Sequence, residues 1–347
     1  MPPQNPPQTT QISASYVHDV ILPEFHERQL VPRDSVVRGP LYKRSQSQVF
    51  KAVFKGHPFP VAVKVFEPGQ GNVHIAEKQF SILEKYHSEI DEGQGFSIPR
   101  PVGYIPRHRT ILMEWMEMPT LGTSLSKPGL FNPFRKRQLG RAAQWLHWFH
   151  NLSAIENKRF DSNHYIVKLD QRIAALPEQV RNVVNDDLFR RCYRLIQSST
   201  SGFEKVSIDH AVVHGDFKPD NLFYSRRRVV GFDFSDPGIR PVTEDICRFL
   251  LNIEIARFPG SGGMKRGTNP QFFSDLELFR GSYGLTRKEL PDAFVAYLML
   301  IEILYLWQGM LIREMQQGTS WWRQQRLKRV LWMAEYFSGK VFPSSKS

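Results

Sequence analysis

The segment Val212-Val-His-Gly-Asp-Phe-Lys-Pro-Asp-Asn221 places an aspartate, Asp216, five positions before an asparagine. A second carboxylate, Asp233, follows the apolar run 229–232, twelve positions after Asn221. A carboxylate can orient a hydroxyl group and accept its proton, and carboxylate and amide oxygens are the ligands that Mg²⁺ prefers. These residues are also typical of a capped turn, but a turn would not require Asp233. The pattern therefore indicates phosphoryl transfer.

This spacing resembles the catalytic segment of the aminoglycoside phosphotransferase and choline kinase family, a branch of the protein-kinase-like fold. The resemblance implies that ATP and Mg²⁺ are the cofactors. It further implies that Asp216 is the catalytic base, that Asn221 and Asp233 are the magnesium ligands, and that His214 braces the loop. Lys218 matches the lysine of the serine/threonine kinase pattern His-Arg-Asp-Leu-Lys-Pro-Glu-Asn and could neutralise the phosphoryl group during transfer.

The elements that must position these residues change character along the chain. Short β-rich runs separated by polar or Gly/Pro breaks, with one helical pattern, predict a small antiparallel sheet at 36–42, 48–54, 60–66, 102–104 and 110–115 and a helix at 76–90. Farther on, helical periodicity covers 138–152, 165–175, 177–198, 243–255, 291–316 and 321–337, with strands at 211–213, 222–224 and 229–232. The sequence predicts an α+β, bilobal protein-kinase-like fold.

The small β-rich N-lobe is expected to bind nucleotide and to span residues 16–117, after a disordered, proline-rich leader over 1–15. The larger, mostly helical C-lobe, residues 118–347, is expected to hold the catalytic loop and the acceptor. The segment Thr243-Glu-Asp245 resembles a helix start of the family, so Asp245 is expected to cap that helix and to steady the catalytic loop.

Lys64 lies in the run Val61-Ala-Val-Lys-Val, which resembles the kinase strand whose lysine contacts nucleotide phosphates and is held by a helix glutamate. Glu77, near the start of the predicted helix, is the first choice of partner. The family pattern Arg-Glu-x-x-x-Leu would instead put Gln79 in the acidic position, and Glu84 is a further candidate.

Two further nucleotide contacts follow from the resemblance. The loop Arg44-Ser-Gln-Ser-Gln48 has no glycine, so Ser47 is expected to reach the β-phosphate through its hydroxyl and backbone N–H. The run Met113-Glu-Trp-Met116 resembles the linker that meets adenine, which implies contacts from the Glu114 carbonyl and the Met116 amide.

Composition fits a folded protein, with 41% hydrophobic and 23% charged residues. Cys192 and Cys247 are isolated, which indicates neither a zinc site nor a disulfide framework, and the polar N-terminus does not resemble a signal peptide. A cytoplasmic location is therefore expected. The run 293–312 has the length of a membrane span, but Glu302 and Gln308 interrupt it, and we expect a buried core helix.

The acceptor is expected to be a small hydroxyl compound, such as a sugar, polyol or amino alcohol, because about ten residues separate Asp233 from Thr243 and leave no peptide-docking segment. A polycationic aminoglycoside fits poorly, since the helical region is rich in Arg and Lys. The alternatives are a protein serine/threonine kinase-like enzyme and a catalytically silent nucleotide-binding scaffold.

The formal charge of +12 is spread along the chain, so no specific nucleic-acid binding is expected. The basic aromatic segment 321–332 favours either an ordinary packed terminal helix or contact with a membrane surface or an anionic ligand. The sequence leaves the oligomeric state open.

Overall fold

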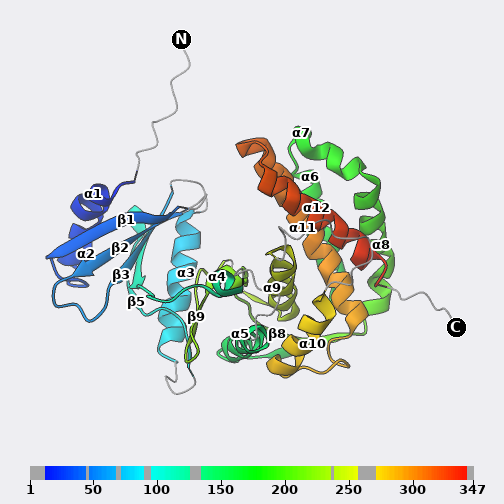
Figure 1. Cartoon of the computed structure of the whole chain (residues 1–347), viewed down its shortest axis with the longest axis horizontal. Coiled ribbons are helices and arrows are strands. Elements are labelled where there is room, and N and C mark those ends of the chain that lie inside the picture. Colours follow the sequence, from blue (N-terminus) through cyan, green and yellow to red (C-terminus); the bar gives the residue numbers. More distant parts are fainter. Residues whose placement is uncertain are drawn as a thin grey trace, which may run out of the picture. The chain divides into compact units, whose positions relative to one another are not determined.

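A computed structural model of the chain describes residues 12–43, 47–67, 72–89, 95–125, 134–235, 238–256 and 271–341 (Figure 1). The chain divides into two compact units, Met1–Met118 with Ser225–Pro237, and Pro119–Tyr224 with Gly238–Ser347. The predicted boundary after residue 117 lies one residue from this division. The return of Ser225–Pro237 to the first unit was not predicted.

The first unit contains a five-stranded antiparallel sheet in the order β1-β2-β3-β6-β5. Its strands are β1 (Ser35–Lys43), β2 (Ser47–Phe54), β3 (Val61–Phe66), β5 (Pro101–Ile105) and β6 (Thr110–Glu114), with the short 3₁₀ helix η3 (Pro106–His108) before β6. β3 is buried along its whole length, which suits its valine-rich sequence. Helix α3 (Asn72–His87) packs on the sheet (Figure 1). The five predicted strands and the helix are confirmed.

The segment Ser225–Pro237 adds a short strand to the first unit. β10 (Val229–Gly231) pairs in parallel with β4 (Phe96–Ser97), and the Val229 N–H donates to the Gly95 carbonyl at 2.9 Å. This pairing holds the residues that follow β10, including Asp233, in the first unit.

The N-terminal part of the first unit begins earlier than the predicted end of the leader. Ser13 caps helix α1 (Ala14–Tyr16) by accepting from the Tyr16 N–H at 3.1 Å, and a π-helical turn, η1 (Val17–Ile21), continues into α2 (Leu22–Glu27). Ile12 and four apolar residues of these helices, Val17, Ile21, Leu22 and Phe25, are buried in the core under the sheet. Residues 12–15 therefore belong to the fold, whereas 1–11 lie outside the described residues.

The second unit is mostly helical, as predicted. Its helices are α4 (Leu121–Leu125), α5 (Arg135–His150), α6 (Ser162–Ala174), α7 (Glu178–Arg181), the 3₁₀ turn η4 (Asn182–Asn185), α8 (Asp187–Phe203), the 3₁₀ turn η5 (Pro219–Asn221), α9 (Thr243–Ala256), α10 (Phe272–Tyr283), α11 (Asp292–Gln317) and α12 (Trp321–Ser338). Two antiparallel pairings join β7 (Glu156–Arg159), β8 (Ser207–Val212) and β11 (Ile239–Pro241), and β9 (Leu222–Tyr224) follows η5.

Two helical features differ from the prediction. A single helix was expected over 177–198, but Asp186 breaks it, because its extended backbone lets its side chain accept from the Leu188 and Phe189 N–H groups and cap α8. Helix α10 was not predicted.

Helix α11 is the core helix of the second unit. Among the described residues it is the helix that is long and apolar enough to cross a membrane, but 78% of its most apolar 18-residue window is buried within the protein. Helices α8, α9 and α12 pack against it (Figure 1). The expectation of a buried core helix agrees with this packing.

A buried ion pair fastens α12 to α9. The Arg329 Nη2 donates to Glu254 Oε2 at 2.8 Å, and the side chains are 4% and 1% exposed. Arg329 also lies over the Trp332 ring, 4.3 Å from its centroid. This part of the basic aromatic segment therefore stabilises the fold and does not form a charged surface.

We predict that Glu254→Gln lowers the stability by about 3–5 kcal/mol, because it leaves the Arg329 charge buried without its carboxylate partner. Urea unfolding would measure the loss. The matched control is the apolar double variant Glu254→Leu/Arg329→Met, which should recover most of the stability. A single variant as stable as the wild type would contradict the buried pair.

Candidate active site

The loop that follows β8 is held by the carboxylate of Asp245. The His214 N–H donates to Asp245 Oδ2 at 2.6 Å, and the Gly215 N–H donates to Oδ1 at 3.0 Å. Gly215 has a φ of +79°, which disfavours a side chain at this turn. Asp245 lies inside the first turn of α9. It therefore steadies the loop as expected, but the prediction that it caps the helix is wrong, because both carboxylate oxygens face the loop.

Asp245 is fully buried, and its surroundings keep it ionised. Burial alone would raise the pKa of this carboxyl, but the hydrogen bond and charge of His150, and the charge and N–H of His214, hold it below its ordinary value. The His150 Nε2 lies 3.2 Å from Asp245 Oδ2, and His150 Nδ1 lies 2.6 Å from the Tyr283 hydroxyl. Burial raises the pKa of Tyr283. The phenol thus stays protonated.

Arg248 ties the same loop to the core helix α11. Its guanidinium donates to the Gly215 carbonyl and, through Nε and Nη2, to the carboxylate of Glu302 at 3.2–3.3 Å. The Glu302 charge raises the pKa of Arg248 against the opposite effect of burial. Glu302, the acidic residue that interrupts the apolar run 293–312, therefore anchors Arg248, which bonds to the loop.

Stacked aromatic rings pack the loop against helices α5 and α9. Trp145 and Phe217 stack with centroids 5.7 Å apart, and Phe217 stacks on Phe249 at 4.8 Å. The fully buried His214 ring packs edge-on against Trp145 at 6.1 Å. His214 therefore braces the loop by ring packing as well as through its backbone N–H.

The loop brings Asp216, Lys218 and Asn221 together. The Asn221 Nδ2 donates to the Asp216 backbone oxygen and to Asp216 Oδ2, each at 2.9 Å, and the Lys218 Nζ donates to the same Oδ2. A backbone carbonyl and a carboxylate oxygen can accept but not donate hydrogen bonds, so the amide atom that faces them must be the nitrogen. The amide oxygen, Asn221 Oδ1, therefore points elsewhere. Asn221 Oδ1 is buried and, within the described ranges, has no hydrogen-bond partner. It is a candidate ligand for a cation.

In the first unit, Lys64 is buried at 5% exposure, and its ammonium lies over the Phe66 ring, 4.9 Å from the centroid. Its Nζ donates to Asp233 Oδ1 at 2.5 Å and to Gln79 Oε1 at 2.8 Å. Asp233 has a φ of +64°, an uncommon left-handed conformation that aspartate tolerates better than most residues. Strained residues of this kind cluster at functional sites.

The structure corrects the helix partner of Lys64. Glu77 is exposed and lies 4.0 Å from His74, and among the described residues no ion pair joins it to Lys64. The buried face of α3 contains Ala76, Gln79 and Leu83, spaced by three and four residues, so position 79 faces the sheet and position 77 faces away. Glu84 is also exposed.

The other predicted nucleotide residues also lie in the first unit. Ser47 is buried at the start of β2, opposite Phe66, while residues 44–46 of its loop lie outside the described residues. Glu114 ends β6, where its N–H donates to the Arg100 carbonyl at 2.8 Å, and Met116 is buried two positions later. Their nucleotide contacts stay predictions.

Asn221 and Asp233, predicted together as magnesium ligands, belong to different units. Their joint role therefore stays a prediction. Sequence reasoning missed three residues that hold the site, His150, Arg248 and Tyr283. They lie on separate helices, and the isolated Glu302 was the available signal that a cation packs against α11.

We predict that the stabilising effect of Asp245 depends on pH. Because its pKa is lower in the folded than in the unfolded protein, its contribution is present above the ordinary aspartate pKa of about 4 and is lost as the pH falls through the folded value. Asp245→Asn should cost at least about 2 kcal/mol at pH 7, and the difference from wild type should shrink below about pH 4.

Melting temperatures of both proteins between pH 7 and pH 3 would measure this. Asp187→Asn, at an exposed position in α8, is the matched control and should differ little from wild type at every pH. A constant difference between Asp245→Asn and wild type over the whole range would contradict the prediction.

Comparison with known proteins agrees with this fold. The profile of the phosphotransferase enzyme family (APH) matches residues 63–263, which is more than half of the chain. No curated protein matches the chain. Solved structures with a similar fold include an ethanolamine kinase from Plasmodium vivax, at 12% identity over 91% of this chain and 87% of that chain with a TM-score of 0.61.

Two other structures are similar over nearly the whole chain. Aminoglycoside 2′-phosphotransferase-IIIa in its GDP complex is 13% identical, over 95% of this chain and 100% of that chain, with a TM-score of 0.58. Amicoumacin kinase in a complex with AMP-PNP and Ca²⁺ is 12% identical, over 94% and 96%, with a TM-score of 0.56. At these identities the likeness shows the fold, so the predicted α+β protein-kinase-like fold is confirmed. The chain belongs to the phosphotransferase enzyme family and is an enzyme that transfers a phosphoryl group to a hydroxyl acceptor.

Proposed function

We propose that the chain is an ATP- and Mg²⁺-dependent kinase that transfers the γ-phosphate to a hydroxyl of a small molecule. The observation that carries the proposal is the arrangement of Asp216 and Asn221, in which the amide nitrogen holds the carboxylate and the amide oxygen stays buried and unpartnered within the described ranges. An amide oxygen in this state costs free energy unless something binds it. A magnesium ion would satisfy it.

The chain's own residues fit that ion. Asn221 Oδ1 and the Asp233 carboxylate are hard oxygen donors, which Mg²⁺ favours, and Asp233 is already held close to the Lys64 ammonium. Magnesium, when bound, neutralises negative charge on the nucleotide phosphates. The complex of amicoumacin kinase with AMP-PNP and Ca²⁺ supports a nucleotide and a divalent cation as cofactors here.

The role proposed for Asp216 follows from its contacts. Asn221 and Lys218 both donate to Oδ2, so the orientation of the carboxylate is fixed, and the side chain is 31% exposed. Its other oxygen can accept the hydrogen of an acceptor hydroxyl and take the proton as the bond to phosphorus forms. Lys218 stays close enough to neutralise charge on the transferred group.

A compact acceptor is supported by the short path from Asp233 to α9. β11 begins at Ile239, pairs with β8, and is followed directly by α9 at Thr243, ten positions after Asp233. A protein kinase places an activation segment and a docking surface for peptides at this point. Ten positions are too few for an activation segment or a peptide-docking surface, so a sugar, polyol or amino alcohol fits better than a protein.

We predict that ATP raises the melting temperature more in the presence of magnesium than in EDTA, because the metal joins the phosphates to the protein and binding stabilises the folded state. Asn221→Ala should remove most of this magnesium dependence. The control is Asn157→Ala, a change at an exposed asparagine in β7, which should preserve it. Equal shifts in both buffers for the wild type would count against the metal assignment.

We predict that a library of small hydroxyl compounds contains acceptors that stimulate ATP turnover, whereas peptide libraries do not. Product mass spectrometry would identify the phosphorylated compounds. Asp216→Asn is the blank: its kcat should fall by about 10²–10⁴-fold, with the ATP-dependent melting shift largely kept. Asp216-dependent phosphorylation of peptides, with no response to any small compound, would contradict the proposal and favour a protein kinase.

A further inference from the structure

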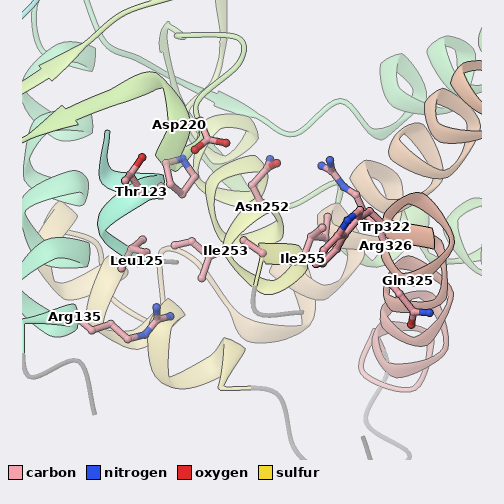
Figure 2. A pocket seen from close by; sticks show the side chains of 13 residues that line it. Thr123, Leu125, Arg135, Asp220, Asn252, Ile253, Ile255, Trp322, Gln325 and Arg326 are labelled. Carbon is pink, nitrogen blue, oxygen red and sulfur yellow. The ribbon is translucent and has the colours of Figure 1, made fainter. Parts of the chain in front are cut away.

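A cavity of about 460 Å³ lies in the second unit beside the catalytic loop (Figure 2). Its wall includes Pro219 and Asp220, which follow Asp216 by three and four positions. The remaining wall comes from α4, α5, α9 and α12. Small-molecule sites span roughly 300–1,000 Å³, so the cavity has the size of a metabolite pocket and borders the loop that carries Asp216.

The wall of the cavity is partly apolar and partly polar. Leu125, Ile253 and Ile255 provide aliphatic surface, and the 65% exposed Trp322 adds an aromatic face. Polar groups come from Thr123, Asn252 and Gln325 (Figure 2). Such a wall suits a compound with a carbon skeleton and a few polar groups.

Arg326 is a cationic residue on the wall of the cavity. Its side chain is exposed at the cavity, and the described part of the chain gives it no hydrogen bond or ion pair. Desolvation lowers the pKa of its guanidinium, the charge of Arg313 lowers it further, and Asp220 acts in the opposite direction. A guanidinium that is partly desolvated next to another cation is stabilised by a bound anion.

The wall has two other charged side chains, Arg135 and Asp220. Arg135 forms an ion pair with Asp275. Asp220 packs against Gly122 of α4, where an added Cβ would lie 1.9 Å from Asp220 Oδ1, so the glycine leaves room for this carboxylate. Asp220 and Trp322 would attract a cationic compound, but the guanidinium of Arg326 on the same wall opposes it.

We propose that the acceptor carries an acidic group, a carboxylate or a phosphate monoester, in addition to its hydroxyl, and that Arg326 binds this group. The inference rests on the proposed function, since it takes the cavity as the acceptor site. It narrows the acceptor from small hydroxyl compounds in general to hydroxy acids or phosphorylated alcohols and excludes simple cationic alcohols. The guanidinium matches both anions through paired N–H donors.

Binding without nucleotide tests the inference apart from catalysis. Glycerate and glycerol 3-phosphate are the anionic probes, glycerol is the uncharged probe with the same skeleton, and choline is the cationic probe. Isothermal titration should show glycerate or glycerol 3-phosphate binding at least about tenfold more tightly than glycerol or choline. The stronger of the two anionic probes indicates whether the natural group is a carboxylate or a phosphate.

Arg326→Gln should remove this preference. The matched control is Arg323→Gln, which makes the same charge change on the same helix, at a residue that contacts Gly318 and Gln317 and does not line the cavity. It should keep the preference. In turnover, Arg326→Gln should raise the KM for an acidic acceptor about tenfold or more with little change in kcat.

The two claims fail in different ways. Arg326-dependent binding of an anionic probe supports the inference even if no compound is phosphorylated, a result that would count against the proposed function alone. The inference is overturned if neither anionic probe binds at millimolar concentration, if glycerol or choline binds as well as they do, or if Arg323→Gln and Arg326→Gln have equal effects.

Discussion

The buried carboxylate of Asp245 is the interaction on which the catalytic loop depends. A carboxylate with no exposed surface is costly unless donors surround it, and here the donors are the backbone N–H groups of His214 and Gly215 and the ring of His150. Because two of them belong to the loop itself, the loop cannot move without leaving a buried charge unsatisfied. The position of Asp216 follows from this, since it is the next residue along the chain.

In the first unit the buried charge is a cation, and the partner that it needs is a carboxylate. The buried Lys64 ammonium needs a counter-charge, and because the helix supplies neutral Gln79, the carboxylate comes from Asp233 on the returning segment. The strained backbone of Asp233 is compatible with a residue held by such a contact. In this chain the lysine therefore depends on Asp233 for its charge balance.

Much of the fold and the catalytic loop could be predicted from the sequence, because both depend on residue patterns within short segments of the chain. Strands such as β3 show as β-branched runs, and the spacing from Asp216 to Asn221 fixes one turn. The helix partner of Lys64 was predicted wrongly because the acidic side chain of Glu77 was favoured over helical periodicity, which puts Gln79 on the buried face. The contact of His150 with Asp245 could not be predicted, since His150 lies on a helix distant in sequence.

The early part of the fold was missed for a related reason. The proline-rich composition of the first residues conceals the apolar positions Ile12, Val17 and Ile21, which are buried under the sheet. Their spacings of five and four positions extend over fewer than three turns, part of which is π-helical, so the periodicity is weak. Burial against a sheet from elsewhere in the chain stabilises this segment, and local sequence does not report such burial.

The most direct test of the account is amide hydrogen exchange of His214 and Gly215 in wild type and in Asp245→Asn. The two N–H groups bonded to Asp245 should exchange slowly in the wild type and much faster in the variant, with amides of the core helix α11 as the internal reference. That result would show that the carboxylate holds the catalytic loop in place. Unprotected His214 and Gly215 amides in the wild type, or equal protection in both proteins, would contradict it.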